Sequence, residues 1–311
     1  MGHEPRRLIS IASIVITLPL NVPAFPERGS AVTASVTATS VGGAFEVMRA
    51  AAATGVPVIN LCPLGTGPNS MVVRQQLRRA GIESHALEVV GDTGLTLTLV
   101  EEGGYYTSIV APGIEAEIEP AALASLEVRT GDVVYLSAGD LVHEPYRRTI
   151  LEWLRDLPGE VTVVMAASPL AGQVSTDTFA EILPYCHVLT GNERELWLLA
   201  GGADDAHICP LVDTLHEADP MIVVRRGARG ADLYRRDMPV AHVASLDYPV
   251  ADTLGVGGTH VGVFVGSLMG GLDPLAALRR ANVAGALAVS HSGGATDLDL
   301  ERLDELASAL V

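Results

Sequence analysis

The chain has 311 residues, of which 48% are hydrophobic, and it carries a formal net charge of −17. So much negative charge argues against a protein that grips a nucleic-acid backbone. All 20 basic residues are arginine. The absence of lysine excludes a Walker A phosphate loop and any Schiff-base mechanism, because both need that side chain. No apolar run reaches the ~20 residues that a membrane span needs.

Cysteine spacing and the first apolar segment indicate where the protein works. Cys62, Cys186 and Cys209 form no CxxC pair, which argues against a disulfide framework or a zinc site and favours a reducing cytoplasm. Arg6-Arg7 followed by an apolar run has the outline of a secretory signal. Its β-branched residues fit a buried first strand better, so we expect a cytoplasmic protein.

The first third of the chain contains strand and helix patterns in alternation. Apolar periodicity predicts strand, strand, helix, strand and helix over residues 8–16, 32–39, 42–54, 56–62 and 70–80. A hairpin is then predicted from Leu95–Glu101 and Tyr105–Val110, because Gly103-Gly104 lies between them. This hairpin and the 32–39 strand are expected to form one accessory sheet, a lid over about residues 17–40 and 93–111.

The rest of the chain alternates more regularly. Strands are predicted at 133–136, 161–165, 187–189, 221–224 and 231–234, and helices at 145–154, 176–183 and 194–200, with further helices at the end. Such alternation predicts an α/β fold in which helices cover both faces of a mostly parallel sheet. No internal repeat divides the chain, so residues 1–311 are expected to form a single domain with its lid.

The glycine-rich stretch Asp252-Thr253-Leu254-Gly255-Val256-Gly257-Gly258 leads into an apolar helix pattern. A glycine-rich turn that opens a helix leaves backbone N–H groups unpaired, which makes a site for a phosphate or an oxyanion. The stretch resembles the signature Asp-Thr-x-Gly-Ala-Gly-Asp of the ribokinase/PfkB family of carbohydrate kinases. The resemblance implies an α/β ribokinase-like fold and an anion hole at Gly255, Val256, Gly257 and Gly258. It also implies a general base at the last position, where this chain has Gly258 and therefore no side chain.

Three further segments resemble the nucleotide side of that family. Asn192 and Glu195 match its Asn-x-x-Glu motif, whose acidic residue acts on Mg²⁺ through water; the alternative is an N-cap and a first-turn acid. Arg225 and the turn from Gly227 to Gly230 follow a strand and resemble the turn beside the nucleotide, although a plain hairpin turn would look the same. Asn282 stands where relatives contact adenine, but a helical asparagine is usually structural. ATP and Mg²⁺ are the cofactors that these matches imply.

The sugar side of the family pattern is only partly kept. The resemblance assigns substrate binding to Ser13, Thr17, Gly42, Gly43, Val47 and Asp140. The aspartate that grips the sugar in relatives falls at Thr17, and Ala44, Phe45 and Val47 replace residues that are usually polar. These changes predict a more apolar substrate site and argue against ribose or fructose. Asp140, His260 and Asp252 are candidates to replace the missing base, and in the family the position of Asp252 supports the anion loop or a monovalent-cation site, so K⁺ is a possible ligand.

Two functions fit these observations. The first is an ATP-dependent kinase of the PfkB type that acts on a small hydroxylated substrate, such as a sugar or a nucleoside. The second is a catalytically silent relative that binds a nucleotide or metabolite. A nicotinamide-dependent oxidoreductase is disfavoured, because the glycine clusters lack the spacing of a dinucleotide site. We also expect a homodimer through the lid sheet, whose candidate apolar face comprises Val32, Val36, Leu95, Leu97 and Leu99.

Overall fold

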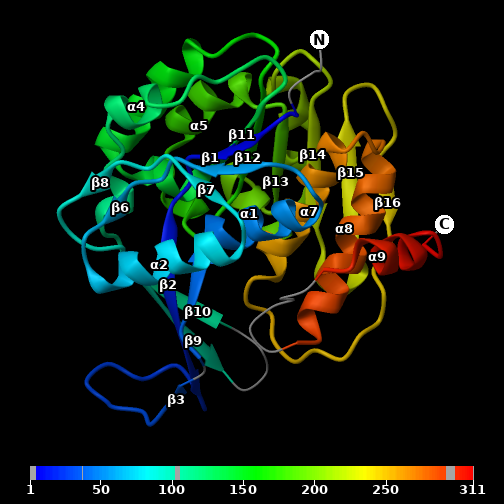
Figure 1. Ribbon diagram of the computed structural model, residues 1–311. Helices are drawn as coiled ribbons and strands as arrows, with labels where there is room; N and C mark the ends of the chain where they lie inside the picture. The colour runs from blue at the N-terminus through cyan, green and yellow to red at the C-terminus, as the bar shows by residue number, and fades with distance from the viewer. Residues whose placement is uncertain (1–4, 37, 102–105, 292–297, 311) are drawn as a thin grey trace.

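Figure 1 shows the computed structural model, which describes residues 5–36, 38–101, 106–291 and 298–310. A nine-stranded sheet forms its centre, with the strand order β16-β15-β14-β13-β12-β11-β1-β5-β7. Its strands are β1 (Leu8–Ser10), β5 (Val58–Asn60), β7 (Glu83–Ser84), β11 (Val133–Ser137), β12 (Thr162–Ala166), β13 (Val188–Asn192), β14 (Met221–Arg225), β15 (Ala231–Arg235) and β16 (Ala241–Val243). All neighbouring strands from β14 to β7 pair in parallel. The pairs β14–β15 and β15–β16 are antiparallel. The predicted mostly parallel sheet is confirmed.

Helices cover both faces of this sheet (Figure 1). One layer comprises α1 (Ala44–Ala53), α2 (Pro68–Arg79), α7 (Val256–Met269), α8 (Pro274–Val289) and α9 (Leu300–Ala307), and the other α3 (Pro120–Ala124), α4 (Glu144–Arg155), α5 (Thr176–Ile182) and α6 (Glu193–Leu199). Successive strand residues face opposite sides, so Val133 packs under the first layer and Val134 under the second. Both layers therefore rest on separate apolar cores. None of the described helices is long and apolar enough to cross a membrane.

Short elements complete the chain. Turns of 3₁₀ helix cover residues 114–116, 138–142, 171–173, 183–185, 205–207, 209–214 and 227–229. The strands β6 (Leu64–Gly65) and β8 (Glu88–Val89) form a small parallel pair.

A second sheet of five strands, the lid sheet, projects from one edge of the molecule (Figure 1). It comprises β2 (Ile14–Val22), β3 (Ser35–Val36), β4 (Ser40–Gly43), β9 (Leu95–Glu101) and β10 (Tyr106–Ala111). β2 is its central strand and pairs with β3, β4 and β9. The two strands of the predicted hairpin are confirmed, while Gly103-Gly104 lie outside the described residues.

Two strand predictions near the lid sheet are wrong. The strand expected over residues 8–16 is two strands in different sheets, β1 and β2. The break follows from the bonds of Ser13, whose N–H donates to the Asp140 carboxylate and whose carbonyl accepts from Ala44. The strand expected over 32–39 reduces to β3 at Ser35–Val36, where these two residues pair with Asn21 and Leu20 of β2.

Helices α1 and α7 cross at backbone-to-backbone distance. A Cβ built on Gly262 would lie 2.3 Å from the carbonyl oxygen of Val47, and one on Gly266 would lie 2.2 Å from Thr54 Oγ1. The contact with the Val47 backbone leaves no room for a methyl group, so glycine is required at 262, whereas the contact at 266 is with the Thr54 side chain. This crossing fixes the start of α1 beside the start of α7.

Candidate active site

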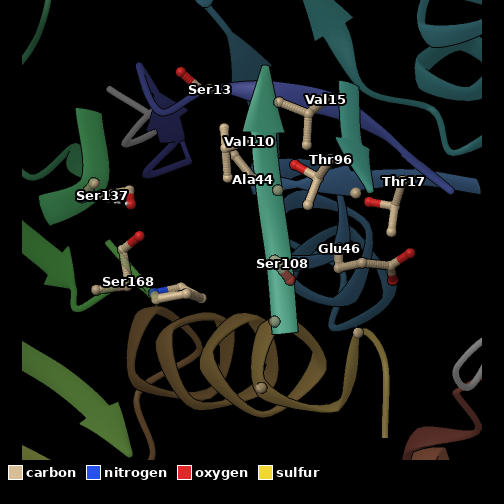
Figure 2. Close-up of a pocket in the computed structure, with 18 of the residues that line it drawn as sticks. Ser13, Val15, Thr17, Ala44, Glu46, Thr96, Ser108, Val110, Ser137 and Ser168 are labelled. Atoms are coloured by element: carbon tan, nitrogen blue, oxygen red, sulfur yellow. Dashed lines mark hydrogen bonds between the residues drawn. The ribbon is translucent and has the colours of Figure 1, made fainter. Parts of the chain in front are cut away.

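A cavity of ≈ 440 Å³ lies where the lid sheet, the start of α1, the carboxyl ends of β11 and β12, and the start of α7 meet. Figure 2 shows Thr17 and Glu46 at one end of the cavity and Ser137 and Ser168 at the other. In open parallel sheets, ligands bind at the carboxyl ends of the strands. The cavity is therefore placed where this class of fold holds its substrates.

The first turn of α7 forms one wall of the cavity. Gly255, Gly257 and Gly258 line it, and Gly255 is the N-cap with a φ of 76°, a left-handed conformation that favours glycine. Neither the Gly257 nor the Gly258 N–H donates to another residue in the described part of the chain. These amides and the positive end of the helix can bind an anion.

Arg225 adds a positive charge to the same wall. A Cβ built on Gly257 would lie 3.6 Å from Cζ and Nη2 of Arg225, so the guanidinium lies against the first turn of α7. Its Nη2 also donates to Glu195 Oε2 at 3.3 Å. An arginine beside free backbone amides is a strong combination for a phosphoryl group.

Asn192 and Glu195 form a complete capping box at the start of α6. Asn192 Oδ1 accepts from the Glu195 N–H at 2.8 Å, and Glu195 Oε2 accepts from the Asn192 N–H at 2.9 Å. The helix-capping alternative for these two residues is thus present in the structure. Glu195 nonetheless lines the cavity as well, whereas Asn192 does not.

Asp140 lines the cavity directly after the end of β11. Its Oδ2 accepts from the Ser13 N–H at 3.1 Å. Burial raises the pKa of Asp140 to about 6, although hydrogen bonds from Ser13 oppose the shift, and the nearby charge of Glu115 adds to it. A carboxylate in this setting can accept a hydrogen bond from a substrate hydroxyl at neutral pH.

Hydroxyl groups from the lid sheet face the cavity, and the sequence argument for an apolar site overlooked them. The cavity is lined by Thr17 and Ser40 and by alternate residues of the β9–β10 hairpin, Thr96, Thr98 and Ser108. Thr98 Oγ1 and Ser108 Oγ lie 3.1 Å apart, as cross-strand partners. The signal was available, because the alternation of threonine and leucine in Leu95–Glu101 places the hydroxyls on one face.

Glu46 of α1 occupies the space beside Gly258. A Cβ built on Gly258 would lie only 2.7 Å from Glu46 Cβ. Glu46 lines the cavity, and its Oε2 accepts from Arg49 Nη2 at 2.7 Å. Burial raises the pKa of Glu46 above its ordinary 4.5, and the Arg49 charge opposes the rise. No sequence pattern marks Glu46 as a site residue.

Comparison with known proteins identifies the family. Residues 5–301 match the pfkB family carbohydrate kinases. The chain belongs to the PfkB family. It is 28% identical over 288 residues to the Escherichia coli "Uncharacterized sugar kinase YegV", covering 91% of this chain and 88% of that one. It is 24% identical to the "ATP-dependent ribose-1-phosphate kinase" of Halopiger xanaduensis, covering 92% and 93%.

Solved structures show the same PfkB architecture. The ribokinase of Cryptococcus neoformans in complex with ADP superposes with a TM-score of 0.81 at 20% identity, over 98% of this chain and 99% of that one. The ribokinase of Giardia lamblia gives 0.82 at 19% identity, over 99% and 100%. The ribokinase-like fold expected from the sequence is confirmed, and the protein is a carbohydrate kinase, a transferase that phosphorylates a hydroxyl group.

Most of the residues that the resemblance to the PfkB family assigned to a site line this one cavity. They are Ser13, Thr17, Gly42, Gly43, Val47, Asp140, Glu195, Arg225, Asp252, Gly255, Gly257 and Gly258. Gly227 and Gly230 lie apart from it, in the turn of the antiparallel β14–β15 hairpin, where Arg226 N–H donates to the Gly230 carbonyl. A separate hollow beside this turn is lined by Glu193, Asp205, Arg226 and Ser245 among others.

Asn282 and His260 are engaged with each other in the interior. Asn282 Oδ1 lies 2.9 Å from His260 Nε2, and its Nδ2 donates to the carbonyls of Val243 and Ala244. Neither residue lines the cavity. Burial lowers the pKa of His260 to about 3, and the Arg225 charge lowers it further. His260 is thus a poor candidate for the missing base, and Asn282 ties α8 to the end of β16.

Proposed function

We propose that this PfkB protein is an ATP-dependent kinase that transfers a phosphoryl group to a hydroxyl of a small uncharged molecule, such as a sugar or a nucleoside. The observation that carries the proposal is one cavity with two chemically different ends. Its α7 wall offers backbone amides and Arg225 to an anion. The hydroxyls of its lid wall and Asp140, at the end of β11, are offered to a polyhydroxylated molecule. A kinase needs both surfaces within reach of each other.

The charges in the cavity favour an acceptor without a phosphate of its own. Arg225 is the one arginine among the described residues that line the cavity, and it lies at the α7 wall. The acceptor side carries Glu115 and Asp140 instead. Carboxylates repel a second phosphate and accept hydrogen bonds from neutral hydroxyls. This chain thus differs from what the name of its ribose-1-phosphate kinase relative implies for that protein.

We expect MgATP to bind with its phosphates at the α7 wall of the cavity. Among the described residues there is no group of three or more His, Cys, Asp or Glu side chains that could hold a metal ion. That agrees with Mg²⁺, which keeps several waters and is held chiefly by the phosphates. Glu195 would hold it through water, and the loop at Asp252 is the candidate for K⁺. When bound, Mg²⁺ neutralises charge on the phosphates.

Binding and turnover test this function separately. Calorimetry with MgATP measures the nucleotide site, and ADP release with neutral sugars, neutral nucleosides and their phosphates measures the acceptor preference. We expect MgATP binding, and turnover with a neutral acceptor in preference to its phosphate. Absence of MgATP binding contradicts the proposal, and a preference for the phosphorylated acceptors contradicts the argument from charge.

Gly258 favours a second candidate, a silent relative that binds MgATP and a metabolite without reaction. A glycine supplies no general base, whose loss typically slows a reaction by ~10²–10⁴-fold. MgATP binding without ADP release for any acceptor would favour this candidate.

We also propose that the protein forms a homodimer through the lid sheet. The face turned away from the cavity is apolar. On it Val36 is 66% and Ile109 54% exposed and Leu97 is half-buried, while Leu99 is already buried. A small sheet with one uncovered apolar face gains stability by pairing. A monomer in light scattering at micromolar concentration contradicts this assembly, and Ile109→Arg should dissociate the dimer.

A further inference from the structure

Positions 46 and 258 compete for the same space between α1 and α7. The Cβ of Glu46 lies 2.7 Å from where a Cβ on Gly258 would be, and real Cβ atoms do not approach so closely. With the two helix backbones as they stand, only one of the two positions can carry a side chain. In this chain the side chain belongs to α1, and it is a glutamate.

The Glu46 side chain extends across the anion-binding turn. From a Cβ built on Gly255, the Cγ of Glu46 would be 3.4 Å away, its Cδ 3.5 Å and its Oε2 3.7 Å. The carboxyl group therefore lies over the first turn of α7, on the wall of the cavity, and its side chain is only 12% exposed. Figure 2 shows it at the end of the cavity that Thr17 lines.

The setting of Glu46 suits proton transfer. Arg49, one turn along the same helix, donates from Nη2 at 2.7 Å and from Nε at 3.1 Å, which fixes the orientation of the carboxylate. A base held by an oriented partner is the arrangement expected of a catalytic pair.

Each of the other carboxylates of the cavity already accepts at least one backbone N–H. Glu115 accepts from the N–H groups of Gly94 and Gly113, and Glu195 from that of Asn192. Asp140 accepts from Ser13 and Asp252 from Leu254. Glu46 Oε2 instead accepts from an arginine side chain of its own helix, Arg49. Glu46 is thus the carboxylate that a substrate hydroxyl can reach with the least rearrangement of the fold.

We propose that Glu46 is the general base of the phosphoryl transfer, an inference that rests on the kinase function proposed above. Glu46 takes the proton of the acceptor hydroxyl as that oxygen forms its bond to the γ-phosphorus of ATP. The bond between that phosphorus and the β,γ-bridging oxygen breaks, and ADP leaves with the electron pair. The protonated Glu46 then returns its proton to solvent. A carboxylate at position 46 then serves the space in which the family signature has one at position 258.

Glu46→Gln tests the role without opening a hole, because glutamine keeps the shape and still pairs with Arg49. We expect kcat to fall by ~10²–10⁴-fold, with the KM for MgATP changed by less than about threefold and the melting temperature unchanged. Glu144→Gln is the matched control, because Glu144 also lies in a first helical turn and pairs with an arginine three residues on. Its side chain is 61% exposed and does not line the cavity. This control variant should leave kcat unaltered.

A double variant that moves the carboxylate from position 46 to position 258 tests for a regain of kcat, so the test does not depend on loss of activity alone. Glu46→Gly alone removes the carboxylate and the interfering Cβ. Adding Gly258→Asp to it places a carboxylate on the α7 side of the same space, and should raise kcat at least about tenfold above Glu46→Gly. Gly258→Asp in the wild-type background should instead destabilise the fold, because its Cβ meets that of Glu46.

The outcomes separate this inference from the proposed function. Calorimetry with MgATP is run on every variant, and ADP release is followed with ribose, adenosine, uridine and water as acceptors. If MgATP binds and Glu46→Gln turns over like the wild type, Glu46 is not the base. The same conclusion follows if the wild type binds MgATP but releases ADP with none of these acceptors. If MgATP does not bind the wild type at all, the kinase function itself is wrong.

Discussion

Gly262→Ala should uncouple the two helices that build the site. The added methyl carbon would lie 2.3 Å from the Val47 carbonyl oxygen and 2.7 Å from Ala50 Cβ. A close C···O contact in proteins is about 3.3 Å, so α1 must move from α7 by roughly 1 Å. The moving part is backbone, which no side-chain rotation can relieve. Because Glu46 lies on α1 and the anion-binding turn on α7, the same shift separates them.

The expected magnitudes follow from two opposing terms. Overpacking a core typically costs ~1–3 kcal/mol, while alanine is favoured over glycine within a helix by about 1 kcal/mol. The net loss is then up to about 2 kcal/mol, or a few degrees in melting temperature for a domain of this size. A misplacement of about 1 Å at a catalytic site can cost ~10²-fold in rate, so activity should fall far more than stability.

Gly285→Ala is the control for this prediction. Gly285 also lies inside a helix, α8, but a Cβ there would have its nearest contact at 3.8 Å, an ordinary distance. This variant should be as stable as the wild type or up to about 1 kcal/mol more stable, with kcat unchanged. Thermal melts and ADP release decide the matter. A Gly262→Ala protein that melts and turns over like the wild type would refute the packing argument, as would equal damage from both alanines.

Three further outcomes are expected. Arg225→Gln should lower kcat by ~10²–10³-fold in the ADP-release assay, because it removes the charge beside the anion-binding turn, whereas Arg229→Gln, at a 65% exposed side chain, should change it little. Burial raises the pKa of Asp140 to about 6, so kcat/KM for the acceptor should rise as the pH increases through that value, since the ionised form accepts the substrate hydroxyl. Asp140→Asn should remove the contribution of this ionisation to the pH–rate profile. Burial opposes ionisation of Asp132, but hydrogen bonds from Arg7 and Arg129 hold its pKa below 3.8. The ionised carboxylate therefore stabilises the fold above pH 3.8. This stabilisation is lost as the pH falls through the lower pKa of the folded state. Asp132→Asn should cost about 3 kcal/mol in urea unfolding at pH 7, with a smaller difference from the wild type at pH 3.

The large sheet could be predicted because its signals are local. The strands between Val133 and Arg235 are short apolar runs, and each α-helix between them has its own apolar period. The alternation could therefore be predicted one segment at a time. The glycine turn at Gly255 was readable for the same reason. The lid sheet was harder, since the course of β2 depends on bonds that Ser13 makes with Ala44 and Asp140, residues distant in the sequence.

The site could be predicted only where its functional groups lie together in one segment of the sequence. A comparison of sequence motifs finds Gly258 without a side chain. From the sequence alone, this indicates that the general base has been lost. Glu46 lies more than two hundred residues earlier, between the apolar positions Phe45 and Val47, and no periodicity marks it as a site residue. Its meaning arises because Gly258 and Gly262 let α7 approach α1 until the Glu46 side chain fills the space that Gly258 leaves. Packing of the glutamate at position 46 therefore requires that position 258 has no side chain. The two residues must be interpreted together.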